Sequence, residues 1–177
     1  AESLAAAGCA EASRWLHYGL TSYDVVDTAL GLQVKQASEL LRQGLEGLRA
    51  ALKARAFEFQ RTVQVGRTHG VHAEPITFGL KLALWYDEAG RDLERLSLAS
   101  EQLEVGKISG AVGNFAHVGP ETEERICARL GLKAAPITSQ VIFRDRHAFY
   151  ISTLALVTAL LEMIALELRH LQRTEVR

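Results

Sequence analysis

The chain has 177 residues and a formal net charge of −1, with 20 Lys and Arg residues against 21 Asp and Glu residues. This length suits one domain with a hydrophobic core, and the balanced charge excludes a basic surface for nucleic acid. Hydrophobic residues make up 48% of the chain, whereas aromatic residues make up 7% and there are 3 prolines. This composition favours an all-α fold over a sandwich of short strands.

The N-terminal segment predicts a short helical piece that ends at Gly19. Because its helical pattern begins abruptly, we expect residues 1–20 to be the end of an N-terminal helical domain. Residues 21–177 are expected to form a central helical-bundle domain, which is incomplete in this sequence.

A long helix is predicted from about residue 23 to residue 60. Thr21 and Ser22 can cap it, and Asp24 follows Thr21 by three residues, as in a capping box. Capping explains both hydroxyl residues, although the same groups can also hold a carboxylate or phosphate. Apolar residues then recur at intervals of four, four and three along one face. Such a helix would be roughly 55 Å long, more than a small globular domain needs.

The stretch Gly66–Pro75, GRTHGVHAEP, lies between two helical patterns and has three interpretations. His69 and His72 have a spacing found in zinc sites, but the sequence supplies no further ligands, so a metal site is disfavoured. The glycines and Pro75 are typical of a connector between helices. The stretch can equally be a rigid loop that presents a histidine for acid–base chemistry. Spacing does not separate the last two interpretations.

A second long helix is expected to begin at Pro75, since proline fits a first helical turn, and to end at Gly106. The glycine-rich loop GKISGAVG follows, and it lacks the spacing of a phosphate-binding P-loop. A short helix is predicted at about residues 121–130, and a third long helix begins near Asp145. This last helix is apolar on nearly all sides, as expected of a helix surrounded by others. One chain offers too few neighbours, so we expect an oligomer.

Two features favour a cytoplasmic location without a membrane span. Cys9 and Cys127 lack metal-ligand spacing and follow no signal peptide, which is typical of reduced thiols. The apolar stretch Ile151–Leu168 contains Glu162 and Glu167, which are costly in lipid. We therefore interpret this stretch as a core helix.

Four motifs occur in order: HYGLTSYDVVDTAL, GRTHGVHAEPITFG, GKISGAVGN and QVIFRDRHA. Together they resemble the adenylosuccinate lyases of the fumarase/aspartase superfamily, and they span Trp15–His147. The resemblance implies the long-helix bundle of that superfamily's central domain, in a homotetramer whose active sites are shared between subunits. It implies β-elimination of fumarate from adenylosuccinate, giving AMP, and from the succinyl-carboxamide intermediate of purine biosynthesis. No cofactor, metal, nucleic acid or membrane is implied.

The resemblance assigns His69 as the general acid that protonates the leaving nitrogen, with Thr68 beside it near the substrate. A histidine near its ordinary pKa suits proton donation to an amine-like leaving group. His72 and Glu74 are expected to hold the shape of the loop.

The remaining matched residues are expected to bind the substrate. Thr21 and Ser22 match the pair that binds the fumaryl carboxylate, and Gln140 matches a glutamine that contacts the substrate. His17 matches a histidine at the phosphate or succinyl end. Within SQVIFRDRHA, ion pairing and capping are the alternative explanation for the polar residues.

The sequence departs from the family pattern at several places. Lys107 and Ser109 are weaker matches in a substrate loop, Tyr23 replaces a serine or threonine, and Phe143 replaces a glutamine. The signature loop S-S-x-M-P-x-K-x-N, which carries the family's general base, does not occur. We expect a fragment that lacks this loop and the N-terminal part, and that has no activity alone.

Two alternatives remain open at this stage. One is another lyase of the superfamily, such as argininosuccinate lyase, fumarase or carboxymuconate cycloisomerase, with the same fold and a different leaving group. The other is a non-catalytic helical assembly domain, in which the histidines belong to connectors.

Overall fold

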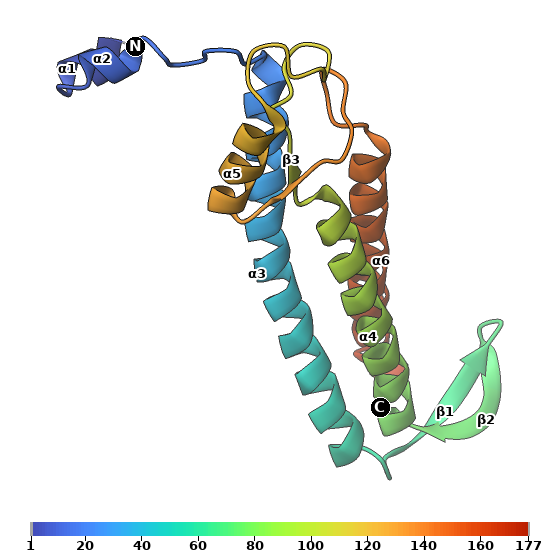
Figure 1. Ribbon diagram of the computed structural model, residues 1–177. Helices are drawn as coiled ribbons and strands as arrows, with labels where there is room; N and C mark the ends of the chain where they lie inside the picture. Colours follow the sequence, from blue (N-terminus) through green and yellow to red (C-terminus); the bar gives the residue numbers. More distant parts are fainter. Residues whose placement is uncertain (1, 177) are drawn as a thin grey trace. The chain divides into compact units, whose positions relative to one another are not determined.

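The computed structural model describes residues 2–176 and confirms an all-α fold dominated by long helices (Figure 1). In chain order the elements are α1 (Glu2–Ala6), α2 (Ala10–Ser13), α3 (Ser22–Glu58), β1 (Val63–Thr68), β2 (Val71–Thr77), α4 (Phe78–Leu103), β3 (Val105–Gly106), α5 (Pro120–Leu130), β4 (Lys133–Ala134), α6 (Asp145–Leu171) and the 3₁₀ turn η1 (Thr174–Val176).

The chain divides into two compact units. The first unit comprises Ala1–Gln36 and Glu101–His147, and the second unit comprises Ala37–Ser100 and Ala148–Arg177. Helix α3 therefore contributes its N-terminal part to the first unit and its C-terminal part to the second. The domain boundary expected after residue 20 stays a prediction.

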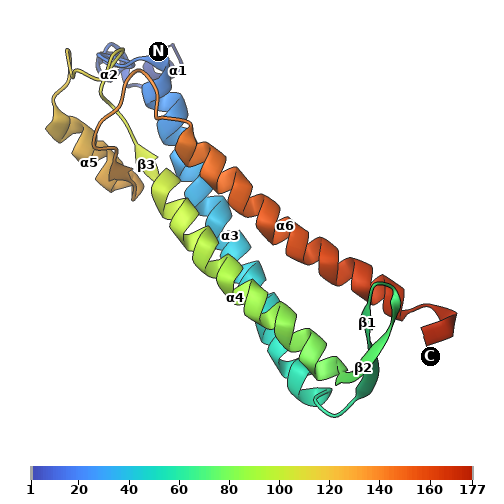
Figure 2. The same cartoon turned by 90° about the vertical axis from the view of Figure 1, so that its right-hand side faces the viewer.

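The core of the second unit lies where the apolar faces of α3, α4 and α6 meet (Figure 2). Leu52 of α3 and Leu160 of α6 pack with Leu82, Trp85 and Ala89 of α4. Residues three and seven positions apart share one face of a helix, which is why these α4 side chains point the same way. Partly buried side chains surround this cluster: Leu48, Ala56, Phe59, Phe78, Tyr86 and Ile164.

The buried face of α3 changes character along the helix. Leu45 and Leu52 are buried in the second unit, as the apolar periodicity predicts, whereas Val26 is 52% exposed in the first unit. The face that α3 buries there carries Asp24 and Asp27 instead. The predicted apolar stripe is therefore buried as far towards the N-terminus as Val34, which is 8% exposed, and is not buried in the first turns of the helix.

Helix α6 buries a single stripe within this chain. Its buried residues are Tyr150, Thr153, Val157 and Leu160. Large apolar side chains on its other sides are exposed: Ile151, Leu156, Leu161, Met163, Leu166 and Leu168. Length and a mean hydropathy of 2.0 would let this helix span a membrane, but core helices of soluble proteins meet the same criteria. The expectation of a helix enclosed on all sides is not met by the described residues of one chain.

The second long helix begins later than expected, because Pro75 lies in a β-hairpin. Strands β1 and β2 pair antiparallel with Pro75 opposite Val65, and the helix begins at Phe78. Thr77 caps it, since its hydroxyl oxygen accepts the N–H of Leu80 at 3.1 Å. Alternating β-branched residues favour the extended conformation here. Proline is tolerated because a two-stranded hairpin consists of edge strands.

Besides α1 and α2, the first unit contains a small parallel strand pair and the short helix α5. Strand β3 pairs with β4, with Val105 opposite Lys133. Helix α5 begins at Pro120 and ends before Gly131, whose φ of 67° is the left-handed conformation of a C-terminal cap. Val105 of β3 forms an apolar cluster with Ala135 and Ile142 in the same unit.

Replacing Leu160 with alanine tests the core of the second unit. Leu160 is 0% exposed, so Leu160→Ala should lower the free energy of unfolding by about 2–5 kcal/mol through lost burial and a residual cavity. Equilibrium urea unfolding of the full-length protein measures this. Thr158→Ala, at an exposed position of the same helix, should cost about 0.5 kcal/mol or less. Equal effects of the two substitutions would contradict this core assignment.

Candidate active site

The first turn of α3 is held by the carboxylate of Asp24. This side chain is fully buried, and its Oδ2 accepts the backbone N–H of Thr21 at 2.8 Å. The contact is one half of a capping box, in which the third helical residue reaches back to the residue before the helix. The hydroxyl oxygen of Thr21 instead accepts the side-chain N–H of Gln140 at 3.4 Å. Ser22, the first residue of α3, is exposed.

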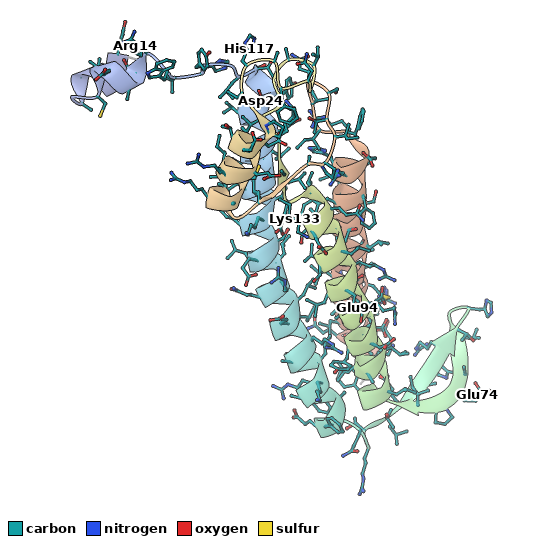
Figure 3. The ribbon with its side chains drawn as sticks, viewed as in Figure 1. Arg14, Asp24, Glu74, Glu94, His117 and Lys133 are labelled. Atoms are coloured by element: carbon teal, nitrogen blue, oxygen red, sulfur yellow. The ribbon has the colours of Figure 1, made fainter. Side chains whose placement is uncertain are left out.

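Asp24 also forms a buried ion pair with Lys107, the residue after β3. Figure 3 shows Asp24 at the N-terminal end of α3, among the loops of the first unit. Both side chains are 0% exposed, and Lys107 Nζ donates to Asp24 Oδ1. Lys107 Nζ also donates to the carbonyl oxygen of Gly110 at 3.3 Å, and the Gly110 N–H donates to Asp24 Oδ2 at 3.2 Å. The lysine expected in a substrate loop is thus paired inside the protein.

The backbone around Lys107 is bonded directly to α3. Thr28 Oγ1 accepts the Lys107 N–H at 3.0 Å and donates to the Lys107 carbonyl oxygen at 3.0 Å. Two glycines permit this close approach. A Cβ on Gly31 would lie 2.4 Å from a backbone oxygen of β3, and one on Gly106 would lie 2.8 Å from Cys127 Sγ. Side chains at either position would push the strand away from the helix.

The residues after Lys107 are held by α5 and by the segment after β4. The carboxylate of Glu123 accepts the N–H of Ile108 at 2.6 Å. Burial raises the pKa of Glu123, and the Ile108 N–H and the nearby Lys107 charge partly oppose that increase. Ser109 Oγ shares a hydrogen bond of 2.7 Å with Thr138 Oγ1, and Ser109 is 1% exposed.

Asp27, one turn after Asp24, holds the segment that carries Gln140. Its Oδ2 accepts the N–H of Ile142 at 2.8 Å, and its Oδ1 pairs with Arg144 Nη1 at 2.9 Å. The Arg144 guanidinium also lies 5.6 Å from the ring centroid of Tyr23. The tyrosine that departs from the family pattern therefore contacts the segment that Asp27 positions.

The first unit brings together the predicted substrate-binding residues of three segments. They are Thr21, Ser22, Lys107, Ser109 and Gln140, with His17 in the turn that precedes Thr21. Lys107 and Ser109 are buried, whereas Ser22, Gln140 and His17 are exposed and Thr21 is half-buried.

Sequence reasoning missed the anchoring roles of Asp27, Thr28 and Glu123, and it found only the capping role of Asp24. A signal was present in α3, because positions 24, 27, 28 and 31 fall on one helix face and carry polar residues or glycine. Polar residues on one face of an otherwise apolar helix indicate that this face forms hydrogen bonds with loops. Nothing comparable in the sequence marks Glu123.

Thr68 and His69 belong to the second unit, at the tip of the β1–β2 hairpin. Thr68 pairs with Val71, so His69 and Gly70 form the two-residue turn. Their φ values are 53° and 76°, which is the condition for a type I′ turn. His69 and His72 are both exposed. Within residues 2–176, no group of three or more His, Cys, Asp or Glu side chains is arranged to hold a metal ion.

Comparisons with known proteins place this geometry among lyases. A family model described as "Lyase" matches residues 1–177. The chain is 53% identical over 167 residues to an adenylosuccinate lyase of Staphylococcus saprophyticus, and 55% identical over 167 residues to that of Bacillus subtilis. Each match covers 94% of this chain and 39% of the relative, so the chain spans about two fifths of their length.

Two solved enzyme structures also superpose on this chain. A fumarate lyase from Mesorhizobium sp. BNC1 superposes with a TM-score of 0.86 at 36% identity, covering 94% of this chain and 40% of that one. A 3-carboxy-cis,cis-muconate lactonizing enzyme from Pseudomonas putida superposes with a TM-score of 0.89 at 33% identity, covering 97% and 39%.

The raised pKa of Glu123 predicts how stability depends on pH. A carboxyl group whose pKa is higher in the folded protein stabilises the fold below its ordinary pKa of 4.5, and this contribution is lost as pH rises through the raised value. Glu123→Gln can still accept the Ile108 N–H but carries no charge. As pH rises from 4.5 to neutral, the free energy of unfolding of Glu123→Gln should therefore fall less than that of the parent.

Thermal unfolding midpoints of the full-length protein across this pH range measure the effect. Glu121→Gln, at an exposed position of the same helix, is the matched control and should show the pH dependence of the parent. If the unfolding midpoint of Glu123→Gln depends on pH as that of the parent does, burial of the Glu123 charge does not limit stability.

Proposed function

The chain belongs to the lyase family whose model spans residues 1–177, and on this premise we propose that the full-length protein is an adenylosuccinate lyase. It cleaves the C–N bond of adenylosuccinate by β-elimination and gives AMP and fumarate. It acts in the same way on the succinyl-carboxamide intermediate of purine biosynthesis, and we place it in the cytoplasm. The observation that carries this proposal is the identity of 53% and 55% to adenylosuccinate lyases over 94% of the chain.

In this proposal His69 is the general acid. The reaction must deliver a proton to the departing nitrogen, and an imidazole can carry one near neutral pH. His69 supports this role because it is exposed at the tip of a short turn, where a substrate can reach it. Thr68 lies next to it, as the last residue of β1.

Thr21 and Ser22 bind the carboxylate that becomes part of fumarate. Elimination passes through a carbanion whose charge spreads onto a carboxylate, so donors fixed in advance lower the barrier. The N-terminus of α3 supports this role, because free N–H groups and the helix dipole favour an anion there. Gln140 adds a side-chain donor, and it is held against Thr21. His17 is assigned to the phosphate or succinyl end of the substrate.

The proposed reaction also needs a general base. The serine-bearing loop that supplies it in the family has no counterpart in the 177 residues. We therefore expect no turnover from these residues alone, and the substrate assay must use the full-length protein.

We further propose that the full-length protein is a homotetramer whose active sites take residues from different subunits. The support is the exposed apolar surface of α6, together with a cavity of about 670 Å³ in the second unit that Leu80, Leu84, Met163 and Leu166 help to line. Large exposed apolar surfaces of this kind are typical of protein–protein contacts.

Replacing His69 tests the catalytic proposal. In the full-length protein, His69→Ala should lower kcat for adenylosuccinate by about 10²–10⁴-fold, the usual contribution of a general acid. The loss of substrate absorbance measures turnover. His72→Ala is the matched control in the same hairpin and should retain most of the activity, since His72 is assigned to loop shape.

Other outcomes select the alternatives. If the full-length protein fails on adenylosuccinate but turns over argininosuccinate or a carboxymuconate, the substrate assignment is wrong while the superfamily remains. If His69→Ala has the parental rate with an intact tetramer, His69 has no catalytic role.

A charge placed on the exposed face of α6 tests the assembly. Leu156 is 50% exposed. Leu156→Glu should dissociate the tetramer of the full-length protein into smaller assemblies, because a carboxylate buried unpaired in an interface is costly. Analytical ultracentrifugation measures the mass. Gln43→Glu, on an exposed polar position of α3, is the control. A tetramer in both variants would show that this face of α6 is not an interface.

A further inference from the structure

The buried pair of Asp24 and Lys107 is not explained by substrate binding or by packing alone. Both side chains are 0% exposed, and a charge buried without its partner is strongly destabilising. An apolar pair of similar size would often serve stability as well. Stability alone therefore does not account for the acceptor oxygens that Asp24 places at this position.

The carboxylate of Asp24 has three partners that belong to different parts of the chain. It accepts the N–H of Thr21 before α3, the ammonium of Lys107 after β3, and the N–H of Gly110 in the glycine-rich loop. Hydrogen bonds to an ionised group are shorter and stronger than neutral ones. One carboxylate thus fixes the backbone at Thr21 relative to the glycine-rich loop.

We infer that Asp24, through the acceptor oxygens of its side chain, is a positioning residue that holds Thr21 and Ser22 in place to bind the substrate carboxylate. Lys107 is its counter-ion and does not touch the substrate. The inference rests on the proposed function, because it takes the carboxylate of adenylosuccinate as the group that Thr21 and Ser22 bind.

The geometry favours Lys107 as a counter-ion of Asp24 over a Lys107 that contacts the substrate. Lys107 Nζ donates to Asp24 and to the carbonyl oxygen of Gly110, so two of its three donors are in use inside the protein. The side chain would have to leave a buried carboxylate unpaired in order to reach a ligand. Among the predicted substrate-binding residues of the first unit, Ser22, Gln140 and His17 are exposed and so remain open to a ligand.

Removing the two charges together tests the inference in the full-length protein. Lys107→Met leaves the Asp24 charge unpaired, and Asp24→Asn leaves the Lys107 charge unpaired, so each single variant should have a lower Tm and a KM for adenylosuccinate raised by about tenfold or more. In the double variant neither Asp24 nor Lys107 leaves its partner as an unpaired charge, and the amide oxygen of the introduced asparagine can still accept an N–H. Its Tm should recover, and its KM should return to within about threefold of the parent.

The matched control is an exposed ion pair of the same unit. Lys133 and Glu101 pair at 2.6 Å with side chains 70% and 63% exposed. Lys133→Met, Glu101→Gln and their combination should leave Tm and KM close to the parental values, since exposed pairs contribute little.

Three results would overturn the inference. A double variant with a recovered Tm but a KM about tenfold or more above that of the parent means that Lys107 binds the substrate directly. A double variant with no recovery of Tm means that the ion pair is not the reason for the loss. Asp24→Asn with parental Tm and KM means that Asp24 positions nothing. If either single variant does not fold, the comparison of the double variant with the parent still decides the first point.

The proposed function can fail separately from this inference. If the parent protein does not cleave adenylosuccinate, the function is wrong, and the role of Asp24 toward that substrate fails with it. The Tm values of the four proteins still measure the coupling of the two charges, because they need no substrate.

Discussion

The ion pair between Asp24 and Lys107 is the contact on which the arrangement of the first unit depends. It lies in the interior, where an unpaired charge is costly and tends to be neutralised by gain or loss of a proton. The pair is stable there because backbone N–H groups of Thr21 and Gly110 share the charge of the carboxylate. The glycine-rich loop needs no secondary structure of its own, since its backbone bonds are made to side chains of α3 and α5.

A second carboxylate on the same helix extends this principle. Asp27 holds the backbone of Ile142 and the side chain of Arg144, so two neighbouring acidic residues hold two different segments. Acidic side chains suit the first turns of a helix because they lie near its positive end. The N-terminal part of α3 is thus used as a support for loops, and its C-terminal part is used as an ordinary core helix.

The sequence predicted the long helices well, because periodic apolar patterns and capping residues are local signals. The hairpin was missed because Pro75 also fits a helix start, although the β-branched residues on either side of the turn favour strands. The capping role of Asp24 was predictable from its distance to Thr21. Its contact with Lys107 was not, since the two residues are 83 positions apart and no local pattern links them.

The site residues show the same division between local and distant information. Motif resemblance selected Thr21, Gln140 and Lys107 together, but it did not distinguish an exposed donor from a buried counter-ion. Burial decides that distinction, and burial depends on how segments far apart in sequence pack.

The turn that carries His69 has a consequence for how this stretch can vary. A two-residue turn fixes the pairing of both strands, and side chains alternate between the faces of a strand. Inserting one residue would therefore shift the register and move the following side chains to the opposite face. Histidine is one of the few residues other than glycine that tolerates a positive φ. The position of the imidazole is thus specified by loop length as well as by residue type, so insertions and deletions should be more damaging here than many substitutions.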